Sequence, residues 1–216
     1  VIMLTGVWTM VKYPSGSLTP FTKNQKQLTR KHHESSSKIM FGDRGMTLEQ
    51  QINESNHFYL MNDTAVVHKK PTPIQIVKVD YPKRSRAVIK EAYFRQASTT
   101  DYNGVYKGYY LDFEAKETRN KTAFPLKNFH EHQITHLAHC LKQLGVCFTI
   151  IKFVTDNRYF VTPASFIIKA WMTPNKSSLT IDEICQCSIE IKAGFRPTLP
   201  YLKAVDQLIL DRNIKQ

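Results

Sequence analysis

The clearest hydrophobic pattern in the chain is a period-two alternation over residues 109–117. Its apolar positions are Tyr109, Leu111, Phe113 and Ala115. Successive side chains of a β-strand point to opposite faces, so this alternation predicts a half-buried strand. The opposite face would carry Asp112, Glu114 and Lys116. A row of this kind is usually a solvated sheet face, so it needs further support before it indicates chemistry.

The same kind of pattern predicts elements on both sides of this strand. Thr47 has the sequence of a capping box, Asn128 suits the N-cap of a helix, and Pro163 suits the first turn of another. Residues 146–153 are apolar on both faces, which is typical of a central strand. The remaining pattern predicts helices over 47–62 and 128–144, helices starting near 162 and 180, an amphipathic segment over 201–209, and strands over 65–68, 74–80, 88–95 and 158–161.

Length and charge narrow the class of protein. At 216 residues the chain can bury a full core as one domain. It carries 30 Lys and Arg against 18 Asp and Glu, a net charge of +12, which makes polyanions such as nucleic acid the first partners to consider. Residues 1–37 are polar and basic without sustained periodicity, and this predicts a flexible N-terminal arm before a main domain over 38–216.

Basic residues are concentrated in the segment 69–97, just before the alternating strand. The two strands predicted there would form an antiparallel hairpin with a basic tip, inserted into the main domain. A hairpin of this kind suits contacts to DNA phosphates, which give affinity without sequence information. A solvated hairpin without a partner is the alternative. The candidate DNA-contacting residues are Lys69, Lys70, Lys83, Arg84, Arg86 and Lys90.

Membrane and secretion classes are not favoured. No apolar stretch approaches the roughly 20 residues that span a bilayer. Residues 1–10 are apolar but lack a basic region and a cleavage site, so we do not expect a secretory signal. The four cysteines do not form a disulfide framework or paired metal-binding motifs. We therefore expect buried or free thiols in a reducing cytoplasm.

Asp101 offers a second interpretation of the acidic strand face, as part of a metal site. It lies 13 residues before Glu114 and is followed by a turn signal at Asn103 and Gly104. A hairpin would bring Asp101 back toward Glu114, with Lys116 beside them. Two carboxylates and a lysine suit Mg²⁺ bound next to a phosphodiester, with the lysine orienting water or offsetting negative charge.

Histidines mark the predicted helix 128–144. Three of them, His132, His136 and His139, share a face, with Cys140 adjacent, so these residues are candidate zinc ligands. Histidines that face solvent or phosphate are more common. Gln133 could face the carboxylates if this helix packs beside the strand.

Five sequence blocks together resemble the RecU family, the Holliday junction resolvases of Gram-positive-type bacteria and their relatives. They cover residues 41–46, 68–73, 99–108, 112–118 and 124–133. The resemblance implies a restriction-endonuclease-like α/β nuclease domain, with a mixed central sheet flanked by helices and a protruding basic β-hairpin stalk. It also implies a homodimer that makes symmetric, Mg²⁺-dependent nicks in four-way DNA junctions during recombination, repair and chromosome segregation.

The resemblance assigns roles to individual residues. Thr99, Asp101, Glu114 and Gln133 would surround the metal, and Asp101, Glu114 and Lys116 would be catalytic. Arg84 matches a position linked to junction handling and to modulation of a RecA-type recombinase, and a RuvAB-type branch-migration motor is a further candidate partner. Two other functions remain open: a non-catalytic junction-binding protein that modulates a recombinase, and a sequence-specific restriction-type nuclease.

Overall fold

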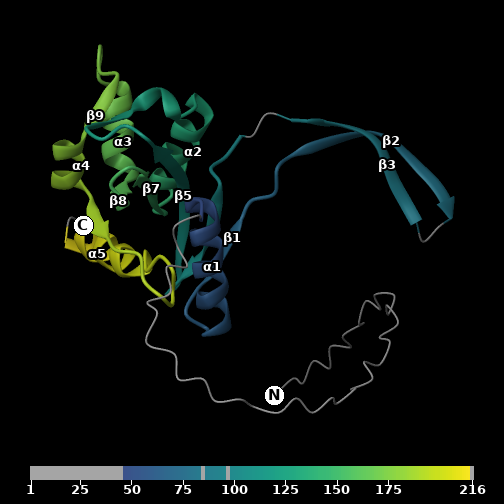
Figure 1. Cartoon of the computed structure of the whole chain (residues 1–216), viewed down its shortest axis with the longest axis horizontal. Coiled ribbons are helices and arrows are strands. Elements are labelled where there is room, and N and C mark those ends of the chain that lie inside the picture. Colours follow the sequence, from purple (N-terminus) through teal and green to yellow (C-terminus); the bar gives the residue numbers. More distant parts are fainter. Residues whose placement is uncertain (1–45, 84–85, 96–97, 215–216) are drawn as a thin grey trace, which may run out of the picture. The chain divides into compact units, whose positions relative to one another are not determined.

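The central element is a mixed six-stranded sheet. The computed structural model describes residues 46–83, 86–95 and 98–214. The sheet has the strand order β1-β4-β5-β7-β8-β10 (Figure 1). The pair β5/β7 is parallel and the other four pairs are antiparallel, so the predicted mixed sheet is confirmed. The strands are β1 (Val66–Lys69), β4 (Tyr102–Tyr106), β5 (Tyr109–Thr118), β7 (Val146–Phe153), β8 (Arg158–Pro163) and β10 (Ile189–Ile191).

Helices cover both faces of this sheet, as expected for a sheet with an apolar central strand (Figure 1). On one face, Leu111 and Phe113 of β5 join a core with α1 (Leu48–Met61) and α5 (Leu202–Ile214). The other face packs against α2 (Glu131–Lys142), α3 (Ala164–Met172) and α4 (Ile181–Cys187). Strand β7 is buried along its whole length. None of the described helices is long and apolar enough to cross a membrane.

The helix starts differ in how well the sequence predicts them. Helix α1 begins as predicted, because the backbone N–H of Gln50 donates to Thr47 Oγ1 at 3.2 Å and that of Thr47 donates to Gln50 Oε1 at 2.9 Å. Asn128 does not cap α2. It ends a 3₁₀ turn, η1 (Leu126–Asn128), and α2 follows after His130. Helix α5 extends beyond the predicted segment.

Two smaller sheets complete the described structure. Strands β2 (Ile74–Lys83) and β3 (Arg86–Phe94) form the predicted antiparallel pair, with register shifts along its length. The pair β6 (Ala123–Pro125) and β9 (Ser178–Thr180) was not predicted. The predicted arm over 1–37 and the predicted Arg84 contact lie outside the described residues.

Candidate metal-dependent nuclease site

The polar face of β5 is buried rather than half-exposed. Asp112 and Glu114 are 0% and 1% exposed. They share a face because they are two residues apart on a strand, and α2 packs against β5. Burial of two carboxylates costs free energy unless each has partners. The solvated sheet face considered from the sequence is therefore wrong for these two residues.

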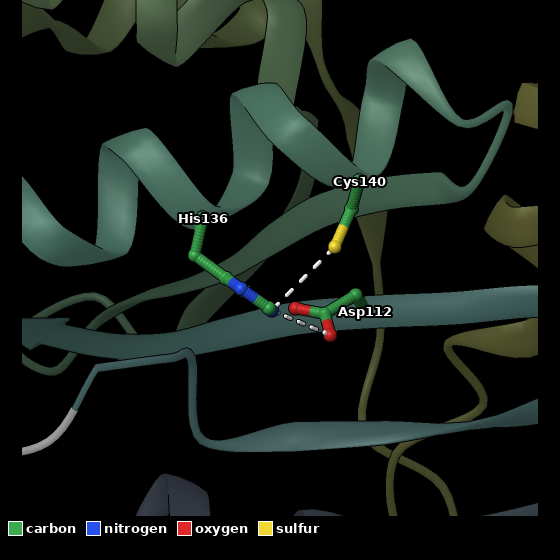
Figure 2. A group of neighbouring side chains, drawn as sticks. All are labelled: Asp112, His136 and Cys140. Atoms are coloured by element: carbon green, nitrogen blue, oxygen red, sulfur yellow. Dashed lines mark hydrogen bonds and ion pairs between the residues drawn. The ribbon is translucent and has the colours of Figure 1, made fainter.

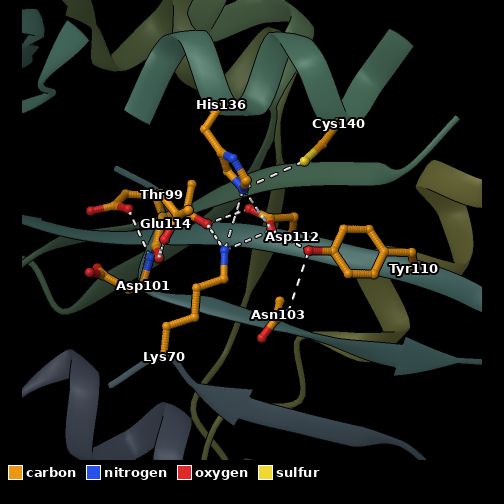
Figure 3. Close-up of polar contacts among 10 residues, drawn as sticks. Lys70, Thr99, Asp101, Asn103, Tyr110, Asp112, Glu114, His136 and Cys140 are labelled. Carbon is orange, nitrogen blue, oxygen red and sulfur yellow. Dashed lines mark hydrogen bonds and ion pairs between the residues drawn. The ribbon is translucent and has the colours of Figure 1, made fainter. Parts of the chain in front are cut away.

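The structure brings Asp101 to Glu114 (Figure 3). Asp101 immediately precedes β4, which pairs with β5 so that Tyr102 lies opposite Phe113. The backbone N–H of Asp101 donates to Glu114 Oε2 at 3.1 Å. In return, Asp101 Oδ2 accepts a hydrogen bond of 3.4 Å from the backbone N–H of Ala115. The antiparallel return of Asp101 was predicted, but the position of its turn was wrong: Asn103 and Gly104 lie within β4, and the chain turns at Lys107 and Gly108.

Lys116 and Gln133 also reach Glu114. Lys116 Nζ lies 2.8 Å from Glu114 Oε1, and Gln133 Nε2 donates to the same oxygen at 2.6 Å. The side-chain oxygen of Gln133 accepts from the backbone N–H of His130 at 3.0 Å, which fixes the orientation of its amide at the start of α2. Thr99 is half-buried beside this group, and its hydroxyl donates to the Thr100 carbonyl at 3.3 Å.

Electrostatics single out Glu114. Burial and the neighbouring carboxylate of Asp101 raise the pKa of Glu114 to about 7, against a lowering effect from Lys116. The charged form of Glu114 is therefore disfavoured in the protein alone. A cation shared with Asp101 would relieve this cost, so these two acids fit a divalent metal ion, because carboxylate oxygens are hard ligands. Gln133 presents its Nε2 rather than its oxygen to Glu114.

A second cluster lies next to this site, around Asp112 (Figure 2). One ligand atom each from Asp112, His136 and Cys140 lies within 4.8 Å of the other two. His136 Nε2 is 3.1 Å from Asp112 Oδ2 and 3.5 Å from Cys140 Sγ. Burial raises the pKa of the Cys140 thiol, and the Asp112 charge adds to the increase, so the thiolate that a metal needs is disfavoured.

The zinc trio considered from the sequence is not the one that the structure brings together. Of His132, His136 and His139, only His136 belongs to the cluster around Asp112. The three histidines line an open cavity of about 440 Å³ along α2, and Ser98, which lies outside this helix, also lines it. The Nε2 atom of His132 is buried and has no hydrogen-bond partner among the described residues.

Lys70 already occupies the cluster around Asp112 (Figure 3). Its Nζ lies 2.8 Å from Asp112 Oδ2 and 3.4 Å from His136 Nε2. The hydroxyl of Tyr110 donates to the same carboxylate oxygen at 2.8 Å, and the hydroxyl of Thr100 donates to Oδ1. Burial tends to raise the pKa of Asp112, but these hydrogen bonds outweigh it and hold the pKa below its ordinary value. Sequence reasoning missed this ion pair.

The predicted DNA-contacting residues differ in their surroundings. The ammonium group of Lys70 points inward and its side chain is only 16% exposed. Lys69 is more exposed and pairs with Glu49, and Lys90 lies 3.6 Å from Asp80 on the hairpin. Lys83 and Arg86 belong to β2 and β3, but the structure does not describe their side chains.

The paired acids define a chemical class. Asp101 and Glu114, with Lys116 two residues further along the same strand, could hold a hard cation with an ammonium group beside it. This is the equipment that hydrolysis of a phosphodiester requires: a place for a metal ion and a positive charge that does not depend on it.

Comparisons with known proteins specify the family. Residues 43–207 match the family model described as RecU: Recombination protein U. A Lactobacillus acidophilus protein named Holliday junction resolvase RecU is 72% identical over 208 residues, covering 94% of this chain and 99% of the relative. A Lactobacillus helveticus protein of the same name is 73% identical over 206 residues, covering 94% and 98%. The chain belongs to the RecU family.

A solved structure shows a more distant likeness. It is that of Archaeoglobus fulgidus Hjc, a Holliday junction resolvase from an archaeal hyperthermophile, with a TM-score of 0.37 and 9% identity. The match covers 61% of this chain and 86% of the other.

Proposed function

We propose that this protein is a Mg²⁺-dependent Holliday junction resolvase that makes symmetric nicks in four-way DNA junctions. The observation that carries the proposal is the hydrogen bond from the backbone N–H of Asp101 to Glu114 Oε2, which brings these two acids together, with Lys116 bonded to the same carboxylate. Membership of the RecU family supports the substrate class, because the relatives are named Holliday junction resolvases.

The metal would be held by oxygen atoms of Asp101 and Glu114, with Thr99 and Gln133 beside them. The raised pKa of Glu114 supports this assignment, because a buried carboxylate next to another gains most from a bound cation. Magnesium supplies Lewis-acid polarisation of the scissile phosphate and a water of lowered pKa. Gln133 keeps Glu114 Oε1 in place through its amide, which His130 orients.

Lys116 contributes a positive charge that the protein holds in place. Its side chain is 15% exposed, and its ammonium group lies 5.7 Å from the ring centroid of Phe129 as well as 2.8 Å from Glu114. A fixed charge in a site of low water content stabilises negative charge on the phosphate more strongly than a mobile surface lysine does. Water attack would leave 5′-phosphate and 3′-hydroxyl ends.

Junction recognition would rest on shape and phosphate contacts. The net charge of +12 supports binding to DNA, and Lys69, Lys83, Arg84, Arg86 and Lys90 are candidates for phosphate contacts. A homodimer would present two sites to two strands, which accounts for paired nicks. We place this activity in recombination, repair and chromosome segregation in the cytoplasm, next to the nucleoid, with RecA-type and RuvAB-type proteins as candidate partners.

The test is cleavage of a four-way junction labelled in turn on each of its four strands, with Mg²⁺ or with EDTA. We expect nicks at symmetric positions in two opposing strands with Mg²⁺ only. Binding without nicks would contradict the enzyme and favour a non-catalytic junction-binding protein. Efficient cutting of linear duplex at one sequence, without preference for junctions, would instead favour a restriction-type nuclease.

A further inference from the structure

The cluster of Asp112, His136 and Cys140 has the side chains and spacing of a metal site, but a lysine holds its centre (Figures 2 and 3). Lys70 Nζ makes contacts of 2.8 Å to Asp112 and 3.4 Å to His136. A metal ion there would lie close to an ammonium group in a poorly hydrated setting, where like charges repel strongly. The carboxylate of Asp112 is already neutralised, and the lysine takes the place of a metal.

Lys70 is tied to the segment that carries Asp101. Its backbone N–H donates to the Asp101 carbonyl at 2.7 Å, and its Nζ donates to Thr100 Oγ1 at 2.9 Å. The hydroxyl of Thr100 donates in turn to Asp112 Oδ1. Thr100 is only 3% exposed. Thr100 is thus held by hydrogen bonds to Lys70 and Asp112, and Asp101 is held through its backbone carbonyl.

This anchoring acts on the same segment as the β4/β5 pairing and the hydrogen bond from the backbone N–H of Asp101 to Glu114 Oε2, neither of which orients the side chain of Asp101. Its carboxylate accepts a long hydrogen bond of 3.4 Å from Ala115, and the charge of Glu114 repels it. Two like charges in a buried site separate if the backbone allows it. The hydrogen bonds among Lys70, Thr100 and Asp112 therefore add to the contacts that fix this backbone segment.

We propose that Lys70 is a positioning residue: through its ion pair with Asp112 it acts as a built-in cation that holds Thr100 and Asp101 so that Asp101 faces Glu114 before a metal ion binds. The inference rests on the proposed function, since it assigns the metal to Asp101 and Glu114. It gives Lys70 an interior role in place of the predicted contact to DNA. It also excludes the Asp112 cluster as a metal site while Lys70 is in place.

The primary variant is Lys70→Met, which keeps the unbranched chain up to the ε position but removes the ammonium group and its charge. Three measurements are needed: thermal unfolding, junction binding without metal, and a Mg²⁺ titration of both cleavage and calorimetric binding. We expect the Mg²⁺ concentration for half-saturation to rise by roughly 10- to 100-fold, as is usual when a partner that orients a metal ligand is lost. Junction binding without metal should change less than about twofold.

A matched control separates positioning from general stability. Lys152 is also a buried lysine, 8% exposed, and it donates to Gln51 Oε1 and the Met46 carbonyl on the α1 side of the sheet. Lys152→Met should lower the unfolding temperature but leave the Mg²⁺ midpoint unchanged. If it shifts the midpoint as much as Lys70→Met, the effect is one of stability and the positioning role is overturned.

A double variant keeps the test interpretable if Lys70→Met unfolds. In Lys70→Met/Asp112→Asn no unpaired charge remains buried, so the unfolding temperature should recover while the Mg²⁺ midpoint stays raised. Recovery of both the unfolding temperature and the Mg²⁺ midpoint would overturn the positioning role and show that Lys70 only balances the charge of Asp112. Thr100→Val, which removes the hydroxyl link alone, should shift the midpoint in the same direction by a smaller factor.

The outcomes also separate this inference from the proposed function. If the wild-type protein neither binds Mg²⁺ nor cuts junctions, the proposed function fails. If the wild type cuts and Lys70→Met has the same Mg²⁺ midpoint and rate, only the positioning role fails. A weaker metal-free affinity for junctions, with a shallower salt dependence and an unchanged midpoint, would restore Lys70 as a DNA contact and overturn the inference.

Discussion

Asp112 and Glu114 are two acids on one face of one strand, yet their surroundings move their pKa values in opposite directions. Asp112 receives hydrogen bonds from Lys70, Thr100 and Tyr110, and its pKa is lowered. Glu114 is buried beside another carboxylate, and its pKa is raised to about 7. The protein alone therefore stabilises the charged form of Asp112, whereas the charged form of Glu114 is disfavoured until a cation binds. The same strand thus carries a structural acid and a candidate metal ligand.

The largest expected effect comes from breaking the acid pair itself. Asp101→Asn removes one of the two charges that a metal would share, so cleavage should fall by about a hundred- to a thousandfold, the range for loss of one preorganised electrostatic group. Binding to junctions without metal should persist. The measurement is single-turnover cleavage, with Asp182→Asn, an exposed acid on α4, as the matched control. Wild-type rates in Asp101→Asn would remove Asp101 from the site.

Substituting Asp112, the other acid of this comparison, should mainly affect stability. Asp112→Asn leaves the Lys70 ammonium group largely buried without its counter-charge, which should lower the free energy of unfolding by about 3 kcal/mol. Glu114→Gln should cause no such loss at pH 8, because it removes a charge that folding disfavours. Denaturant unfolding of both variants measures the difference. Equal losses would mean that the two acids do not differ as described.

The pH dependence of stability sharpens the comparison further. Because the pKa of Glu114 is raised from 4.5 to about 7, the folded protein binds more protons than the unfolded chain between these pH values. The free energy of unfolding of the metal-free protein should therefore fall as pH rises through this window, by about 3 kcal/mol from this group. Denaturant unfolding at several pH values should show this component in the wild type and not in Glu114→Gln. Parallel profiles would contradict it.

The smallest expected effect concerns one hydrogen bond to Asp112. Tyr110→Phe removes the 2.8 Å bond from the phenol to Asp112 Oδ2 and should cost about 1 kcal/mol, because Lys70, Thr100 and His136 remain. Denaturant unfolding measures the change. Tyr93→Phe, which removes an exposed bond to Glu91 on the hairpin, is the control and should cost less. A loss as large as that of Asp112→Asn would mean that Tyr110, rather than Lys70, stabilises the acid.

Much of the site could be predicted because its signals are local. The alternation in β5 placed Glu114 and Lys116 on one face, and an antiparallel return of Asp101 was predicted, although its turn lies at Lys107 and Gly108 rather than at Asn103 and Gly104. The structure has this return as the β4/β5 pair. The mixed sheet was implied by the family resemblance, whereas the antiparallel hairpin of β2 and β3 also follows from a short-range pattern. In each case residues that are close in the sequence determine the geometry.

What could not be predicted depends on contacts between distant residues. Lys70 and Asp112 are 42 positions apart, and a lysine in a basic segment gives no sign that it turns inward. The alternation also could not show that α2 covers the polar face of β5. The start of α2 was placed too early because Asn128 suits an N-cap, but η1 takes up that residue. The short pair β6/β9 has too few residues for a periodic signal.

The most direct test of the central claim is to locate a bound metal. A crystal soaked in Mn²⁺, with anomalous data, reports where a divalent cation binds and what Lys70 contacts at the same time. The account predicts a peak in contact with Asp101 and Glu114, with Lys70 still bonded to Asp112. A peak among Asp112, His136 and Cys140, with Lys70 displaced, would contradict it.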